Sequence, residues 1–360
     1  MSILLRNPLG GSVRVVAAGI EGLPSGVIVD DAVVDNTQFV TAIKKLLEKV
    51  RAKNSAMNAV IAMPGSKVVI KQIKLDAALS ETDAEARAWQ EARKTFPEIA
   101  KNLFLDFMQT EQFTIGKNKK FLLTLIATRK EDISPRVEAL SQSGLVTKIV
   151  DVDYYALERA YQLFANQLPT NHAATHVALV DFNPHSILFV VMNKKKAIYY
   201  NRQIYTGDVL VPFVQRAMNL DIAPLKIKPV FLAPIRLMPL QAAETEAAAA
   251  STSDDNVYIP STLTEDQKSH VVMSFRRLFQ SFYAENPGRV IEHIVITGRC
   301  ALIGELTEHI GKMMDIPTTV ANPLLNLKMG DNLDAERILK LGPAFAVSCG
   351  LAMRGIPLWI

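Results

Sequence analysis

Three strand-length apolar runs follow one another between His176 and Asp208. An Asn-Pro pair separates the first run from the second, and three lysines separate the second from the third. Apolar, β-branched runs with such separators predict three antiparallel strands. Residues 177–182 are apolar except for Asp181. We therefore expect a central strand that is buried on both faces and carries a carboxylate at its carboxyl end.

A second pattern, of strand, turn and helix, covers residues 293–314. Gly298 stands at the exit of an apolar strand and just before the helix. Free backbone N–H groups at a helix N-terminus favour anionic ligands. Ligands of open sheets bind at the carboxyl ends of the strands. Asp181 and Gly298 are therefore the first candidates for a ligand site.

The start of the chain predicts a smaller α/β unit. Residues 13–18 and 27–34 have the composition of strands and are separated by turn residues. Asp35 then precedes an amphipathic helix over residues 37–53. Residues 59–63 predict a short buried strand, which ends in the sequence Pro-Gly-Ser.

Residues 67–148 follow a different pattern, which predicts a separate excursion of the chain. Glycines mark a hairpin turn and the end of a helix there, and the charges of the first helix suit its dipole. The expected order is strand, helix, two hairpin strands, helix and strand, at residues 67–75, 82–95, 103–113, 120–128, 134–143 and 146–150.

The remaining elements are mostly helical. Helices are predicted over residues 151–168, 209–220 and 264–284, the last beginning at a threonine cap. Residues 229–262 contain four prolines and an alanine run and predict a mobile linker. Residues 342–355 predict a helix of small residues, which permits close packing at a hinge between domains.

Composition narrows the class of protein. The chain has 360 residues, 49% of them apolar, and a net charge of +4, which is too mild to indicate nucleic-acid binding. Two cysteines cannot form a disulfide framework, so a reducing compartment is expected. No apolar run approaches the ~20 residues of a membrane span, and the first residues lack the hydrophobic region of a signal peptide.

The strand that ends at Asp181 and the turn at Gly298 resemble the second phosphate-binding hairpin and the adenosine-side turn of actin-like ATPases. With the excursion at residues 67–148, the sequence is most similar to the PilM family of type IV pilus assembly proteins, relatives of FtsA. The resemblance implies an α/β, actin-like (Ribonuclease-H-like) two-domain fold with an FtsA-type inserted subdomain. It implies a first subdomain, an inserted subdomain and a second domain, at residues 1–66 plus 149–171, 67–148 and 172–360.

The resemblance also implies a site for ATP, with Mg²⁺ bound only alongside the nucleotide. The cofactor-binding positions that match the family are Asp181, Asn183, Ser186, Gly298 and Arg299. The family has glycines where this chain has Asn183 and Arg299, and Pro184 removes a backbone N–H. The opening strand and the first phosphate loop of the family are also expected to be absent. Either the chain lacks an N-terminal segment, or the loop has been lost.

Plain structural roles compete with several of these assignments. Asp181 before Asn-Pro also fits a turn-initiating residue. Asp151 and Asp153 fit helix caps better than magnesium ligands, and Cys300 fits a small buried residue better than a nucleophile. No pair of histidines or cysteines has metal-binding spacing, so no metal site is predicted.

The resemblance implies a scaffold on the cytoplasmic face of the inner membrane, attached through a partner and without direct membrane insertion. That scaffold captures the cytoplasmic N-terminal peptide of PilN and links the pilus alignment complex to the assembly motor. The family's peptide groove lies between the first and the inserted subdomain, which makes Met63, Pro64, Gly65 and Ser66 candidate partner-binding residues. With three departures at the nucleotide site, no catalytic residue is assigned. The alternative is an active ATPase or phosphotransferase that uses the same cleft.

Overall fold

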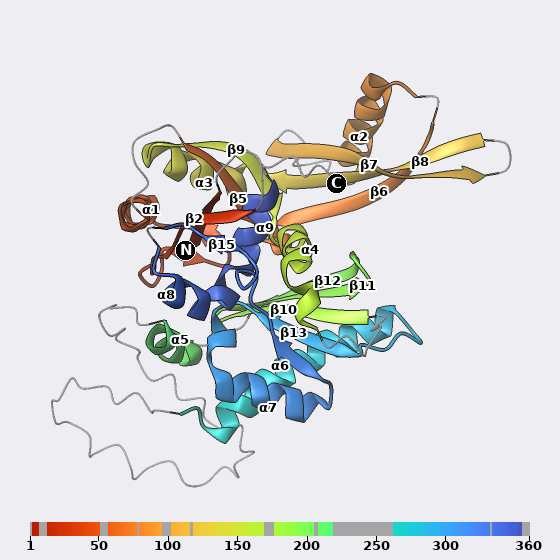
Figure 1. The fold of residues 1–360 in the computed structure, drawn as a ribbon. Coiled ribbons are helices and arrows are strands. Elements are labelled where there is room, and N and C mark those ends of the chain that lie inside the picture. The colour runs from red at the N-terminus through yellow and green to blue at the C-terminus, as the bar shows by residue number, and fades with distance from the viewer. Residues whose placement is uncertain are drawn as a thin grey trace, which may run out of the picture.

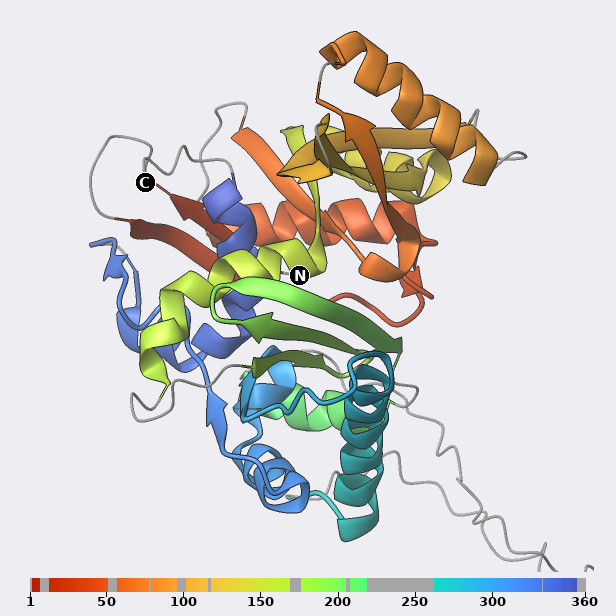
Figure 2. The ribbon, with the colours of Figure 1, turned by 90° about the vertical axis from the view of Figure 1, so that its right-hand side faces the viewer.

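A computed structural model describes residues 2–6, 13–50, 57–77, 79–95, 102–115, 118–168, 176–204, 208–218, 262–331 and 333–354. Two groups of strands lie on either side of helix α4 (Asp153–Phe164), and an arm projects from the first group (Figure 1). The view at right angles again shows α4 between the two groups (Figure 2). Both halves of the molecule therefore pack against α4.

The second half is built on a five-stranded sheet of order β12-β11-β10-β13-β14. The first three strands form the predicted antiparallel meander, and β13 and β14 extend it in parallel, which is the expected Ribonuclease-H-like arrangement. Residues 177–182 are all buried, which confirms the central strand. The strands are β10 (His176–Asn183), β11 (Ser186–Asn193), β12 (Lys196–Ile204), β13 (His293–Thr297) and β14 (Thr318–Val320).

Both faces of this sheet are covered, as its apolar strands require. Val180 and Phe182 pack against helices on one face, whereas Val177 and Leu179 pack against α4 on the other. The capping box at Thr264 confirms the predicted start of the long helix. The helices of the first face are α5 (Val211–Ala217), α6 (Glu265–Glu285) and α7 (Gly304–Met314).

The chain begins with a strand that its pattern did not predict. Strand β1 (Ser2–Arg6) pairs antiparallel with β2 (Arg14–Ile20). The expectation that the opening strand is absent is therefore wrong. A five-residue segment carries a weak local signal, and its pairing with β2 decides its conformation. The loop between the two strands, where the first phosphate loop was sought, lies outside the described residues.

The strand predicted over residues 27–34 is a small hairpin instead. Strands β3 (Ile28–Val29) and β4 (Ala32–Val33) flank a turn in which Asp30 and Asp31 have φ values of 48° and 62°. Aspartate tolerates this left-handed conformation better than the surrounding valines do. Helix α1 (Asn36–Lys49) then begins as predicted, because the Asp35 carboxylate accepts a hydrogen bond from the Gln38 N–H.

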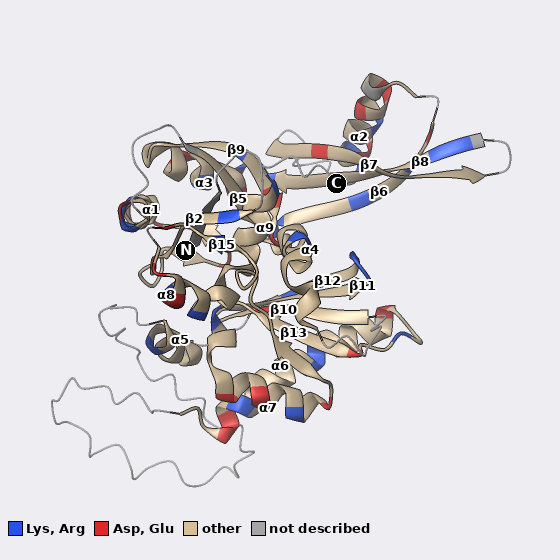
Figure 3. Ribbon diagram, in the orientation of Figure 1, with Lys and Arg blue, Asp and Glu red and all other residues tan. Residues whose placement is uncertain are grey.

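The arm has its own sheet and its own core. Its strands have the order β6-β8-β7, and α2 (Glu81–Thr95) packs on one face of the sheet. The predicted hairpin places Lys119 and Lys120 at the outer end of β8 (Figure 3). The three strands are β6 (Val68–Asp76), β7 (Leu103–Ile115) and β8 (Asn118–Arg129).

The two elements after the arm rejoin the first half of the molecule. Helix α3 (Lys130–Gln142) packs against α1, and β9 (Leu145–Val152) pairs in parallel with β5 (Met57–Met63). The domain limits at residues 66, 148 and 171 stay a prediction. The strand pairing favours ending the inserted part where β8 ends, at Arg129.

The last elements also return to the first half. Strand β15 (Lys328–Met329) pairs in parallel with β2, α8 (Ala335–Lys340) follows, and α9 (Ala346–Arg354) lies against α4. A Cβ atom at Gly350 would lie 1.8 Å from the carbonyl oxygen of Ala156, so this crossing needs glycine. The predicted close packing of the final helix is confirmed. Residues 229–261 of the predicted linker lie outside the described ranges.

The crossing of α4 and α9 generates a stability prediction. We expect Gly350→Ala to lower the free energy of unfolding by about 1–3 kcal/mol, because the added methyl group forces two packed helices apart. Urea unfolding measures this change. Gly304→Ala is the control, since nothing lies within 4 Å of a Cβ at that helix start. Equal stability of the two variants would contradict the close crossing.

Candidate functional site

One row of residues crosses the five-stranded sheet at the carboxyl end of β10. In the strand register, Asp181 lies beside Thr297 on one side and Leu188 on the other, and Leu188 lies beside Arg202. Neighbours in such a row point to the same face of the sheet. Leu188 packs in the core that contains α4. Asp181 and Arg202 therefore both face the first half of the molecule.

The Asp181 carboxylate already has partners within its own sheet. The Thr297 hydroxyl donates a 3.1 Å hydrogen bond to one oxygen, and the Asn183 amide donates a 2.6 Å bond to the other. Burial raises the pKa of this carboxyl, while both hydrogen bonds lower it. Asn183 pairs with Ser186, which leaves Pro184 and His185 as a two-residue turn. Pro184 has no N–H to offer a phosphate.

The other predicted part of the nucleotide site is the turn at Gly298. Its φ is 87°, and a Cβ there would lie 2.4 Å from the Phe182 carbonyl oxygen, so glycine is required where β13 meets β10. The backbone N–H and Nε of Arg299 both donate to the Asn183 side-chain oxygen, at 3.2 and 3.0 Å. The fold thus brings the two predicted motifs together, and their side chains satisfy one another.

Arg202 forms a closed ring of interactions with the first half of the molecule. One guanidinium nitrogen lies 2.7 Å from an Asp153 oxygen, and the other lies 2.7 Å from an Asp31 oxygen. The remaining oxygen of Asp31 accepts from the Ser66 hydroxyl at 2.8 Å, and that of Asp153 accepts from the Gly65 N–H at 3.0 Å. We call Arg202, Asp31, Asp153, Gly65 and Ser66 the Arg202 ring.

Neither Asp151 nor Asp153 acts as the predicted helix cap. Val152 holds the N-cap position of α4 and makes no side-chain cap bond. Asp153 is the first helical residue and binds Arg202, whereas Asp151 forms an ion pair with Arg159. Spacing along the chain could not reveal these partners, because Arg202 lies 49 residues from Asp153.

Burial makes Asp153 unusual among the carboxylates of the ring. Burial raises the pKa of Asp153 to about 6, although the Arg202 charge and the N–H groups of Gly65 and Tyr154 lower that pKa. A charged Asp153 is therefore costly in the folded protein, and Arg202 offsets part of that cost.

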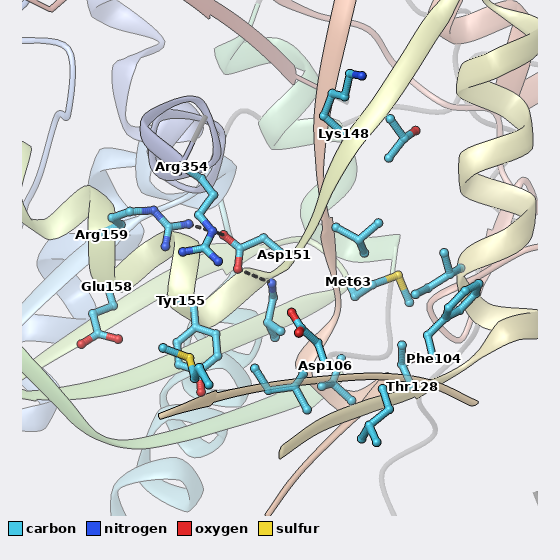
Figure 4. Close-up of a pocket in the computed structure, with 18 of the residues that line it drawn as sticks. Met63, Phe104, Asp106, Thr128, Lys148, Asp151, Tyr155, Glu158, Arg159 and Arg354 are labelled. Atoms are coloured by element: carbon cyan, nitrogen blue, oxygen red, sulfur yellow. Dashed lines mark hydrogen bonds and ion pairs between the residues drawn. The ribbon is translucent and has the colours of Figure 1, made fainter. Parts of the chain in front are cut away.

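A groove of about 570 Å³ lies between the arm and the first half of the molecule (Figure 4). Strands β7 and β8 form one side, and α3, β9 and α4 form the other. Of the four predicted partner-binding residues, Met63 lines this groove, while Gly65 and Ser66 belong to the Arg202 ring.

The groove runs along the edge of β9. Successive side chains of a strand point to opposite faces of the sheet. Residues from both faces of β9 nevertheless line the groove, namely Thr147, Lys148, Val150 and Asp151. Within the described residues, β9 has a single strand partner, β5. Backbone groups on the free edge therefore face the groove.

Two buried hydroxyls in the groove lack partners. The Oγ1 atoms of Thr128 and Thr147 form no hydrogen bond within the described part of the chain. The rest of the lining is largely apolar, with Phe104 and Val150 partly exposed at 46% and 38%. Buried polar atoms seldom stay unpaired in folded proteins, so these hydroxyls are available to water or to polar groups of a ligand.

The other candidates have plain roles. Cys300 is fully buried in the apolar core, and burial raises the pKa of its thiol, which favours the small buried residue over the nucleophile. The described residues contain no cluster of side chains that could hold a metal ion. None of the described helices combines the length and apolar character that crossing a bilayer requires.

The sequence did not single out Arg202, Asp31 or the groove threonines. Arg202 lies in a strand of mixed polarity, where an arginine ordinarily faces solvent. The one available signal was its position, since it occupies the same cross-strand row as Asp181.

The raised pKa of Asp153 generates a pH prediction. The folded state holds this proton more tightly than the unfolded state, so the contribution of Asp153 to stability falls as pH rises from 4 to 7. We expect Asp153→Asn to gain about 2 kcal/mol relative to the wild type over that range. Urea unfolding at several pH values measures it, with Asp331→Asn as the control for net charge. A difference that does not change with pH would contradict the buried charge.

Comparisons with known proteins agree with this geometry. The family model described as "Type IV pilus assembly protein PilM" matches residues 2–226 and 240–356. The structure of a "PilM-PilN type IV pilus biogenesis complex" is similar with a TM-score of 0.69 at 19% identity, over 99% of this chain and 95% of that one.

Other solved structures are similar at a lower level. The ethanolamine utilization protein EutJ from Carboxydothermus hydrogenoformans has a TM-score of 0.43 at 10% identity, over 97% of this chain and 92% of that one. MreB5 of Spiroplasma citri bound to ADP has a TM-score of 0.39 at 10% identity, over 91% and 77%. The fold is the actin-like one that the sequence predicts, and since the family model spans nearly the whole chain, this chain belongs to the PilM family of type IV pilus assembly proteins.

Proposed function

We propose that this chain is a cytoplasmic actin-like scaffold of the type IV pilus assembly platform, and that its groove holds the cytoplasmic N-terminal peptide of a PilN protein. The observation that carries the proposal is the groove along the free edge of β9. The similar PilM-PilN complex supports the choice of partner. The scaffold would stand at the inner membrane through that partner and connect the pilus alignment complex to the assembly motor.

The groove has the chemistry that an extended peptide needs. An added strand would pair its backbone with β9, and its alternate side chains would enter the apolar lining. Thr128 and Thr147 would supply hydrogen bonds to those backbone groups of the peptide that cannot pair with β9. Of the four predicted partner-binding residues, Met63 lines the groove, and because it is only 1% exposed we propose that it supports the wall against which the peptide lies.

One end of the groove is charged. Asp151 has two cationic neighbours there, Arg159 in a close ion pair and Arg354 with its Nε 3.9 Å from the same oxygen. One carboxylate cannot neutralise both guanidinium groups, and the Arg354 side chain is half exposed. We propose that this surplus positive charge sets the direction of the peptide by attracting an acidic or carbonyl group.

We also propose that the nucleotide site is degenerate. Gly298 keeps the close approach of backbone that a bound adenosine needs. The other members of the site do not fit a nucleotide with Mg²⁺. Asp181 is buried and hydrogen-bonded within its sheet, and Arg299 fills the turn and binds Asn183. Ser186 is paired in the strand ladder behind Pro184. An active ATPase is therefore the less favoured alternative.

Two valines of β9 offer a matched test of the peptide groove. Val150 lines the groove and Val146 does not, yet both are exposed on the same strand, at 38% and 43%. We expect Val150→Glu to weaken binding of the PilN N-terminal peptide at least about tenfold, because it buries a charge against the apolar part of the peptide. Val146→Glu should bind as the wild type does. Isothermal titration with a scrambled peptide as control measures both, and equal affinities of the two variants would exclude this groove.

The nucleotide site has a direct test. Calorimetric titration with Mg-ATP should give no saturable heat, and about 1 mM Mg-ATP should leave the melting temperature unchanged, because a ligand that does not bind cannot stabilise the fold. Saturable binding that Asp181→Ala abolishes would establish the alternative, an ATPase or phosphotransferase.

A further inference from the structure

The Arg202 ring connects the two halves of the molecule through one side chain. Arg202 is the member that comes from the five-stranded sheet, whereas Asp31, Gly65, Ser66 and Asp153 come from the β3–β4 turn, the turn after β5 and the start of α4. Its guanidinium forks to two carboxylates, and all three side chains are at most 16% exposed. A second contact lies beside it, since the rings of Tyr200 on β12 and Tyr154 on α4 stack with centroids 4.1 Å apart.

Two short backbone segments connect the Arg202 ring to the peptide groove. Met63 and Val152 lie opposite each other at the end of the β5–β9 ladder, and both line the groove. Two residues after Met63, Gly65 donates to Asp153, which itself follows Val152. Any shift of the ring therefore moves one wall of the groove, although Arg202 itself does not line it.

We propose that Arg202 is a built-in clamp that fixes the five-stranded sheet against the segments 63–66 and 152–155, without a bound ligand, and thereby holds the groove in the shape that accepts a peptide. The part that concerns the peptide rests on the proposed function. The clamp is specific to arginine. The ammonium of lysine is a single point charge on a flexible stem and cannot reach both carboxylates with the fixed fork of a guanidinium. Loss of Arg202 leaves two buried carboxylates without their cation.

The first experiment measures affinity for the PilN peptide in the full chain. We expect Arg202→Met to weaken binding about tenfold or more, and Arg202→Lys to have a smaller effect. Arg277→Met, at an exposed position of α6, is the matched control and should bind as the wild type does. Wild-type affinity in folded Arg202→Met would overturn the proposal.

The second experiment tests the clamp without any peptide, by measuring the distance between the two halves. Spin labels at Lys45→Cys on α1 and Gln280→Cys on α6, both exposed, report the distance between the two halves, while the native Cys300 and Cys349 are buried. We expect one narrow distance distribution with Arg202 and a broad one in Arg202→Met. A narrow distribution in both would overturn the clamp. Failure of the wild type to bind the peptide would instead remove the proposed function, and broadening would still support the clamp.

A third variant keeps the proposal testable if Arg202→Met does not fold. Arg202→Met combined with Asp31→Asn and Asp153→Asn removes all three charges and keeps side-chain oxygens for Ser66 and Gly65. We expect this variant to fold, because the three charges of the Arg202 ring are removed together and the buried Arg136 keeps its bonds to the backbone carbonyls of Asp31 and Asp132. It should show the broad distance distribution and the weak peptide binding. A folded triple variant with wild-type behaviour in both measurements would overturn the clamp.

Discussion

Buried carboxylates between the two halves of the molecule set the constraint on which the rest depends. Asp31, Asp153 and Asp181 lie where the sheet of the second half faces the first half. Asp153 and Asp181 are buried and the Asp31 side chain is 15% exposed, so water stabilises their charges poorly. Such groups need cations or hydrogen-bond donors. The chain supplies both from its own side chains, with Arg202 between two of the carboxylates and Asn183 and Thr297 at the third. A site satisfied in this way has little left to offer a metal ion or a phosphate.

The groove, in contrast, contains polar groups without partners among the residues that the structure describes. Its hydroxyls at Thr128 and Thr147 lack partners, and β9 keeps a free edge beside an apolar lining. A free strand edge is a hazard, because it can pair with any other extended chain. Here residues of the arm and of α3 line the groove beside this edge. The carboxylates of the cleft have partners within the chain, although the buried Nε of Arg202 has none in the described ranges. The groove offers an apolar lining and a free strand edge, and this contrast is why we favour a scaffold over an enzyme.

Much of the fold could be predicted from the sequence, because its elements have strong local signals. The apolar run before Asp181, the capping box at Thr264 and the strand-exit glycine at Gly298 are each encoded within a few residues. One error came where strand pairing decides the conformation, and another where a tight turn interrupts the pattern. Strand β1 depends on its pairing with β2, and the hairpin at Asp30 and Asp31 depends on two left-handed residues that interrupt an apolar run.

The candidate site was less predictable, because it is made by contacts and not by motifs. The sequence predicted five nucleotide-site positions, yet it could not show that three of them, Asp181, Asn183 and Arg299, are linked by hydrogen bonds. It placed Met63 at the groove by resemblance and missed Thr128 and Val150, which reach the same groove from the arm and from β9. Asp153 was interpreted as a cap, since a local role is what spacing alone can suggest.

The same geometry suggests how an actin-like fold can serve as a scaffold if its nucleotide site is degenerate, as we propose. Two domains joined by a hinge need something to fix their relative position, and in an enzyme of this shape a bound substrate can do so. Here Arg202 and the stacked pair of Tyr154 and Tyr200 lie at the junction and, in our proposal, fix it. The position of the two halves then no longer depends on a soluble ligand. Met63 and Val152, at the end of one ladder, pass that fixed position to the groove wall. A scaffold benefits from a fixed groove wall, because a preorganised strand edge lowers the entropy cost of binding an extended peptide.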